Sequence, residues 1–327
     1  MALAASMHDQ APSPGLLRAV LTLLAGGVMA QALPLLLGPL LTRLYTPQEF
    51  GIYHLFAAVA ANLAVVACAR YEFALPMARE DSEAQALRAL CLWILAGVSF
   101  ASLLGGVAWA VAAGAAWPLY LPLAVAMLGA LSLATLSATR AQRYRSLAAA
   151  RALQYGGGAL AQAGAGWAQA GVAGLIVGPI AAAGLALLAL RLRIAAWWQT
   201  PRAGLREAAR RYREFPLLNT PHAFAGALQD TLSVALIAAA LGPAAAGFWG
   251  LALRYLKAPA TLVGGAVSQA LYPRLAHDGR GATPEARRAV ARVMVVLALI
   301  ATPLVLLLWL LGPWLFEIAF GAQWRAA

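Results

Sequence analysis

Charged residues, lysine and cysteine are all scarce in this sequence. Charged side chains make up 11% of the 327 residues and hydrophobic ones 62%, and there are two cysteines. Soluble domains contain about 25% charged residues, so a soluble globular fold is excluded. The single lysine, Lys257, precedes Ala-Pro rather than following a glycine-rich loop, which excludes a P-loop ATPase.

Residues typical of catalytic and metal sites are also few. The four histidines are scattered and form no HExxH motif or Cys/His cluster, so we predict neither a metal site nor a cofactor. Cys68 and Cys91 fall at the predicted cytoplasmic ends of two spans, where thiols stay reduced and a structural disulfide is not expected. The outer connections are too short to fold a catalytic domain. We therefore expect that the protein is not an enzyme.

Long apolar runs dominate the chain instead. A run of about twenty apolar residues can cross a bilayer as a helix, and no strand-like alternation is present. The sequence predicts an all-α integral membrane protein, a polytopic helical bundle with nine or ten transmembrane helices. The nine spans are 17–41, 51–70, 88–112, 119–139, 148–169, 171–190, 217–241, 246–271 and 290–311, and a tenth could begin near Pro313.

Arginines alternate between connections. Those after the second, fourth, sixth and eighth spans are rich in arginine, whereas the others contain almost none. Under the positive-inside rule, this places the N-terminus in the cytoplasm of a bacterial cell, with the chain crossing the inner membrane several times. Because the net charge of +12 is distributed in this way, no nucleic-acid partner is expected.

The pattern also predicts two lobes. We expect a cytoplasmic tail over 1–15, a six-helix N-terminal lobe over 16–191, a cytoplasmic amphipathic basic linker over 192–214, and an incomplete C-terminal lobe over 215–327. Arginines recur every three or four residues in the linker, which favours contact with anionic membrane lipids over substrate binding.

Two segments flanking this linker resemble each other. "TRLYTPQEFGIYHLF" (42–56) aligns with "AAALGPAAAGFWGLAL" (238–253) at a constant offset of 196 residues, which pairs Pro47 with Pro243 and Gly51 with Gly247. Repeats of the same orientation are common in transporters that rock two lobes around a central site. The alternative is that proline and glycine simply recur in similar outer turns.

Ionisable residues within predicted spans are candidates for the site, because they are costly in lipid. Arg254 and Lys257 lie three residues apart on one helix face, and the only acid well inside a span is Asp230. The cations either snorkel or pair with this acid, or they line a wet cavity that receives an anion, which we favour. Asp230 is either a salt-bridge partner or a protonatable coupling group.

Four other polar residues are further candidates for the passage or its mouth. Gln31 and Asn62 could line the same passage or tie helices together. Arg70 and Glu72, in "RYEFALP", could reach the cavity mouth or could simply be boundary charges.

Four motifs resemble those of bacterial polysaccharide repeat-unit (O-antigen-type) flippases, of the multidrug/oligosaccharidyl-lipid/polysaccharide exporter superfamily. The motifs are "LLTRLYTPQEFG" (40–51), "RYEFALP" (70–76), the basic span containing "LALRYLKAPATLVGG" (251–265) and the terminal "FGAQWRAA" (320–327).

The resemblance implies two helical bundles that move an undecaprenyl-pyrophosphate-linked oligosaccharide across the inner membrane by alternating access, for surface polysaccharide or lipopolysaccharide synthesis. It implies substrate contacts for Arg43, Arg70 and Arg254, with Lys257 beside them, and a polysaccharide polymerase and glycosyltransferases as partners. Such flippases have twelve or more spans, so we expect this sequence to be C-terminally truncated. The alternatives are a drug or cation exporter, a non-transporting remnant or, less favoured, a membrane polymerase or ligase.

Overall fold

The computed structural model describes residues 32–191, 200–257 and 284–325, which are helical with no strand among them. Five helical segments in this part are long and apolar enough to cross a membrane: Pro47–Val66, Asp81–Ala113, Trp117–Arg140, Gly171–Leu190 and Phe215–Leu241. The all-α membrane class is therefore confirmed.

These five segments, counted over the described residues alone, are fewer than the nine spans predicted for the whole chain. The predicted span 148–169 falls on one continuous helical segment, made of α6 (Tyr144–Arg151), the π-helix η3 (Ala152–Gly157) and α7 (Gly158–Trp167). Predicted spans 17–41 and 246–271 extend beyond the described residues. Predicted span 290–311 lies within α13 (Pro284–Phe320).

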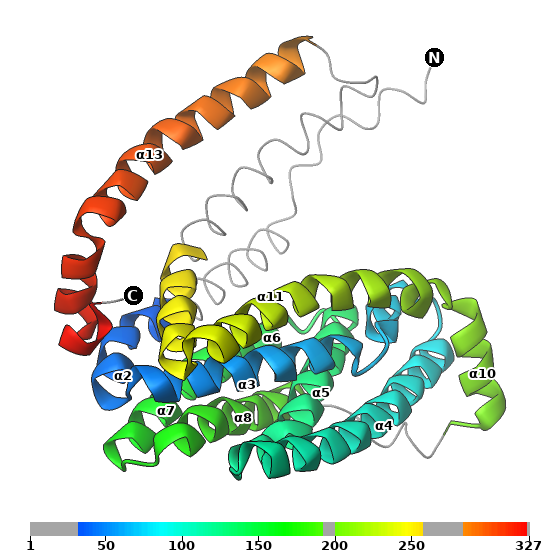
Figure 1. The fold of residues 1–327 in the computed structure, drawn as a ribbon. Coiled ribbons are helices and arrows are strands. Elements are labelled where there is room, and N and C mark those ends of the chain that lie inside the picture. The colour runs from blue at the N-terminus through cyan, green and yellow to red at the C-terminus, as the bar shows by residue number, and fades with distance from the viewer. Residues whose placement is uncertain (1–31, 192–199, 258–283, 326–327) are drawn as a thin grey trace.

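The bundle is built from α3 (Pro47–Val66), α4 (Asp81–Ala113), α5 (Leu121–Arg140), α7 and α8 (Gly171–Leu190) (Figure 1). Helix α8 packs closely on α7 because Gly174 and Gly178 have no side chains to hold the helices apart. A Cβ at Gly174 would lie 2.6 Å from that of Ala165, and one at Gly178 would lie 3.0 Å from the backbone of Gln162. Small residues spaced four apart commonly allow helices to approach this closely.

The corner between α2 (Gly38–Leu44) and α3 explains the first sequence motif. Thr46 caps α3, since its side chain accepts from the backbone of Glu49 and the Glu49 carboxylate accepts from the Thr46 backbone. Pro47 occupies the first helical position, where its missing N–H costs nothing. Tyr45 is buried and donates its hydroxyl to the carbonyl of Gln162 at 2.7 Å.

A tight turn follows α3. Ala69 and Arg70 both adopt positive φ, at 47° and 61°, which costs about 1–2 kcal/mol for each residue that is not glycine. The turn directs the short helix η1 (Tyr71–Met77) back against α4 and α5. Glu72 is thereby buried in the bundle, with only 2% of its surface exposed.

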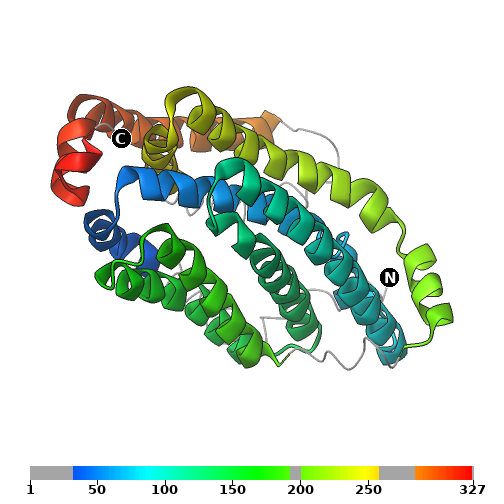
Figure 2. The same ribbon diagram turned by 60° about the horizontal axis from the view of Figure 1, so that its bottom comes forward.

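The basic linker contains α10 (Arg202–Arg211), and Figure 2 shows this helix beyond the end of α4. Arg211 forms an ion pair with Glu83 of α4 at 3.0 Å, and Tyr71 donates to the carbonyl of Ala209 at 3.2 Å. The predicted helix is present in the described part of the linker. Residues 192–199 of the linker lie outside the described residues.

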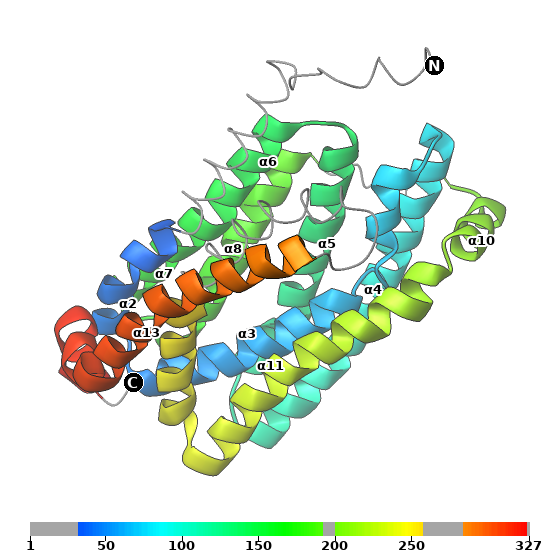
Figure 3. The same cartoon turned by 90° about the horizontal axis from the view of Figure 1, so that it is seen from above.

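Helix α11 (Thr220–Leu241) runs alongside α3, as Figures 1 and 3 show. The Thr231 hydroxyl donates to the carbonyl of Ala58 at 3.1 Å and links the two helices. After Gly242, with φ of 89°, the chain turns into a second helix over 243–257 that crosses α3.

The crossing brings the two matched segments into contact with each other. A Cβ at Gly51 would lie 1.7 Å from the carbonyl oxygen of Pro243, and a Cβ at Gly247 would lie 2.0 Å from that of Pro47. Each glycine therefore packs on the proline of the other segment. Recurrence of these residues in two unrelated turns would not require this reciprocal contact.

The end of α13 packs against α2 (Figure 1). Trp324 is fully buried and donates its indole N–H to the carbonyl of Thr42 at 2.8 Å, while the Gln323 amide donates to the same carbonyl at 2.7 Å. These donors satisfy a carbonyl near the end of α2 that has no partner in the following turn. The motif at 320–327 thus contacts the motif at 40–51.

Candidate functional site: a cationic cavity beside the helix crossing

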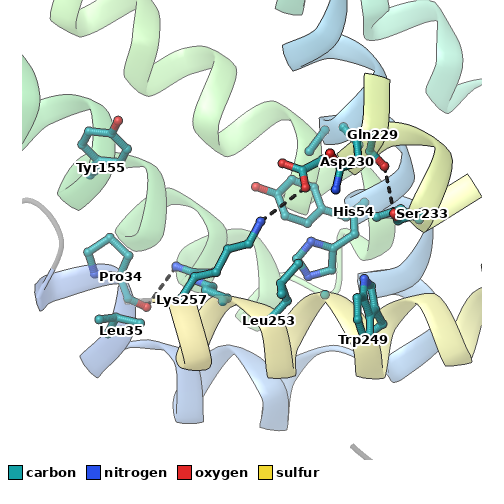
Figure 4. Close-up of a pocket in the computed structure, with 16 residues that line it drawn as sticks. Pro34, Leu35, His54, Tyr155, Gln229, Asp230, Ser233, Trp249, Leu253 and Lys257 are labelled. Carbon is teal, nitrogen blue, oxygen red and sulfur yellow. Dashed lines mark hydrogen bonds and ion pairs between the residues drawn. The ribbon is translucent and has the colours of Figure 1, made fainter. Parts of the chain in front are cut away.

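A cavity of about 800 Å³ lies beside this crossing (Figure 4). Helix α3, helix α11 and the 243–257 helix supply most of its lining, and Pro34 and Tyr155 complete it. Three charged residues line it: Arg254, Lys257 and Asp230. The structure therefore brings together the three charges that the sequence analysis placed within predicted spans.

Arg254 is held by a backbone carbonyl rather than by an acid. Its guanidinium donates to the carbonyl of Pro34 at 3.1 Å, and the neighbouring Tyr255 donates to the carbonyl of Leu35 at 2.7 Å. The Leu35 carbonyl is available because Pro39, four residues later, has no N–H to donate. Arg254 is thus positioned while its charge remains without an acidic partner among the described residues.

Lys257 pairs with Asp230, one of the alternatives left open by the sequence. The ammonium nitrogen lies 3.3 Å from the Asp230 carboxylate, and the two side chains are 53% and 66% exposed. An exposed pair of this kind contributes about 0–1 kcal/mol. Since the pair lies at the cavity rather than in the core, an anion could displace Asp230 at little cost.

His54 also lines this cavity, which sequence reasoning missed. Its imidazole Nε2 is buried without a hydrogen-bond partner among the described residues. The 243–257 helix approaches so closely that a Cβ at Gly250 would lie 2.3 Å from the His54 ring. The 196-residue offset pairs these two positions, so the repeat was the signal that could have indicated this contact.

A second hollow, of about 350 Å³, shares Tyr155 with the cavity. Its lining includes Phe73, Ser132 and Arg151, and the Arg70 guanidinium lies 4.4 Å from the centre of the Phe73 ring. Arg151 lines this second hollow and Arg254 and Lys257 line the cavity, and Tyr155 belongs to both linings. Arg151 was not among the predicted site residues.

The remaining predicted residues do not line the cavity. Arg43 is exposed at the end of α2, and Gln31 lies outside the described residues. Asn62 is buried, and its amide nitrogen has no hydrogen-bond partner within the described part of the chain. Glu72 accepts a hydrogen bond from Ser132 at 3.4 Å, and burial raises its pKa. Roles for these residues in substrate transfer stay predictions.

The fold and cavity define an all-α integral membrane protein whose charged hollow lies against an internal repeat. A family model described as "polysaccharide biosynthesis protein" matches residues 40–327, and the chain belongs to this family. The predicted resemblance to polysaccharide transporters is confirmed. No curated protein and no solved structure gives a significant match.

Proposed function

We propose that the protein is a flippase that moves an undecaprenyl-pyrophosphate-linked oligosaccharide across the bacterial inner membrane. The main support is the cavity, in which two cations face one acid. Such a site favours an anion, and charge-assisted hydrogen bonds to phosphate are about twice as strong as neutral ones. The family match supports a role in polysaccharide biosynthesis.

The arrangement suggests how the anion would be received. Arg254 would bind one phosphate while remaining fixed by Pro34, and Lys257 would exchange Asp230 for the other phosphate. Tyr155, between the two hollows, provides a flat surface that suits a sugar ring. In this proposal the lobes rock at the Gly51–Gly247 contact, and the N-terminus is cytoplasmic.

Transport of a labelled lipid-linked glycan in proteoliposomes tests the proposal. A hydrogen bond to a charged group contributes about 1.5–3 kcal/mol, so Arg254→Gln with Lys257→Gln should slow transfer by at least about tenfold. Arg145→Gln, at an exposed arginine on α6, is the matched control and should transfer at the wild-type rate. Equal rates for the double variant and this control would refute the proposal.

A drug or cation exporter would use the same cavity differently. Asp230 would then bind the cargo, so Asp230→Asn should abolish transport of a cationic dye. In a flippase this substitution frees Lys257 and should leave glycan transfer intact or faster. The excess of cations over acids favours the flippase.

A further inference from the structure

A second cluster lies away from the cavity. The Sγ atoms of Cys68 and Cys91 and a carboxylate oxygen of Glu72 all lie within 4.8 Å of one another. All three residues are at most 2% exposed, and both cysteines are free. The tight turn at Ala69 and Arg70 separates Cys68 from Glu72 and turns the carboxylate toward the thiols.

The carboxylate is what distinguishes this cluster from two ordinary buried cysteines, which pack as small hydrophobic residues. Glu72 Oε1 accepts from Ser132, whereas Oε2 is buried without a partner among the described residues. A buried carboxylate is costly unless a proton or cation neutralises it. The unpartnered oxygen is therefore where a proton or a cation would bind.

We propose that Cys68, Glu72 and Cys91 bind a thiophilic divalent metal ion, with Zn²⁺ as the best fit. Thiolate ligands select such ions over Mg²⁺ or Ca²⁺. In tetrahedral geometry two sulfurs, each at about 2.3 Å from zinc, lie about 3.8 Å apart. The ligand atoms of the cluster lie within 4.8 Å of one another, so side-chain adjustments on the order of 1 Å would bring them to one ion. Both thiols release their protons on binding, because the thiolate is the ligand.

Charge favours a divalent ion over Cu⁺. Two thiolates and one carboxylate have a charge of −3, which Zn²⁺ reduces to −1 and Cu⁺ only to −2. Arg70, which interacts electrostatically with Glu72, offsets part of the remainder. The ion would join the end of α3 to α4 and stabilise the turn between them.

The chain has only two cysteines, so any thiolate signal comes from this cluster. The protein would be expressed with added Zn²⁺, purified in detergent under reducing conditions and washed with chelator before its metal content is measured. In parallel, Cd²⁺ titration would follow the ultraviolet thiolate-to-metal band. We expect one zinc ion per chain and a Cd²⁺ band, both lost in Cys68→Ser and Cys91→Ser.

Glu72→Gln should weaken Zn²⁺ binding by more than about tenfold, since even residues that only orient a ligand contribute that much. Glu80→Gln, at an exposed acid, is the matched control and should bind like wild type. The metal content of the wild-type protein tests the proposal even if a substituted variant does not fold. A folded wild-type protein with neither zinc nor a Cd²⁺ band would overturn the proposal, as would zinc retained by the doubly substituted, cysteine-free protein.

Discussion

Alanine at Gly51 should separate the 243–257 helix from α3. Its Cβ would lie 1.7 Å from the Pro243 carbonyl oxygen, so the helices would have to move apart by roughly 1.5 Å or more to reach ordinary contact. Overpacking of this kind costs about 1–3 kcal/mol. Gly247→Ala should have a similar cost, because its Cβ would lie 2.0 Å from the Pro47 oxygen.

Since one separation relieves both clashes, the two costs should not add. The double variant should lose about as much stability as Gly51→Ala alone, an interaction energy of about 1 kcal/mol or more. Thermal unfolding in detergent, followed by tryptophan fluorescence, would measure this. Gly226→Ala on α11 is the matched control, because its Cβ meets nothing within 4 Å and alanine favours a helix. Strictly additive losses, or a Gly51→Ala variant as stable as Gly226→Ala, would refute the reciprocal contact.

Two further predictions concern buried side chains. Trp324→Ala should destabilise the protein by about 3–5 kcal/mol because it leaves a cavity, whereas Trp314→Ala, at a 58% exposed residue, should have little effect in the same thermal assay. In the metal-free protein, where burial raises the pKa of Glu72, its contribution to stability is fully present below the unfolded-state pKa and is lost as pH rises through the folded-state pKa. Glu72→Gln should therefore remove a fall in melting temperature with rising pH, and Glu80→Gln should not; equal pH profiles for wild type and Glu72→Gln would contradict this.

The apolar runs were enough to predict the helical membrane class, because lipid leaves few ways to satisfy the backbone. They do not show where the hydrogen bonding changes within a helix. The glycine-rich stretch at 152–157 widens into a π-helix inside the continuous helix over 144–167, and hydropathy cannot detect this change of hydrogen bonding.

The candidate site was predictable where charge is rare. Arg254, Lys257 and Asp230 stood out because each is costly in lipid, and the structure brings them to one cavity. The hydrogen-bond partners of these residues could not be predicted from the sequence, because they depend on tertiary contacts. The Pro34 carbonyl that accepts from Arg254, for example, is 220 positions away. The cluster of Cys68, Glu72 and Cys91 was not predicted. It depends on the positive-φ turn after α3, and the spacing of these residues in the sequence matches no metal-binding motif.

The contact between Trp324 and Thr42 spans 282 positions. During synthesis, the Thr42 carbonyl cannot receive the indole N–H of Trp324 until almost all of these residues have left the ribosome. This contact therefore forms late in synthesis. It can form only when the end of α13 has reached α2.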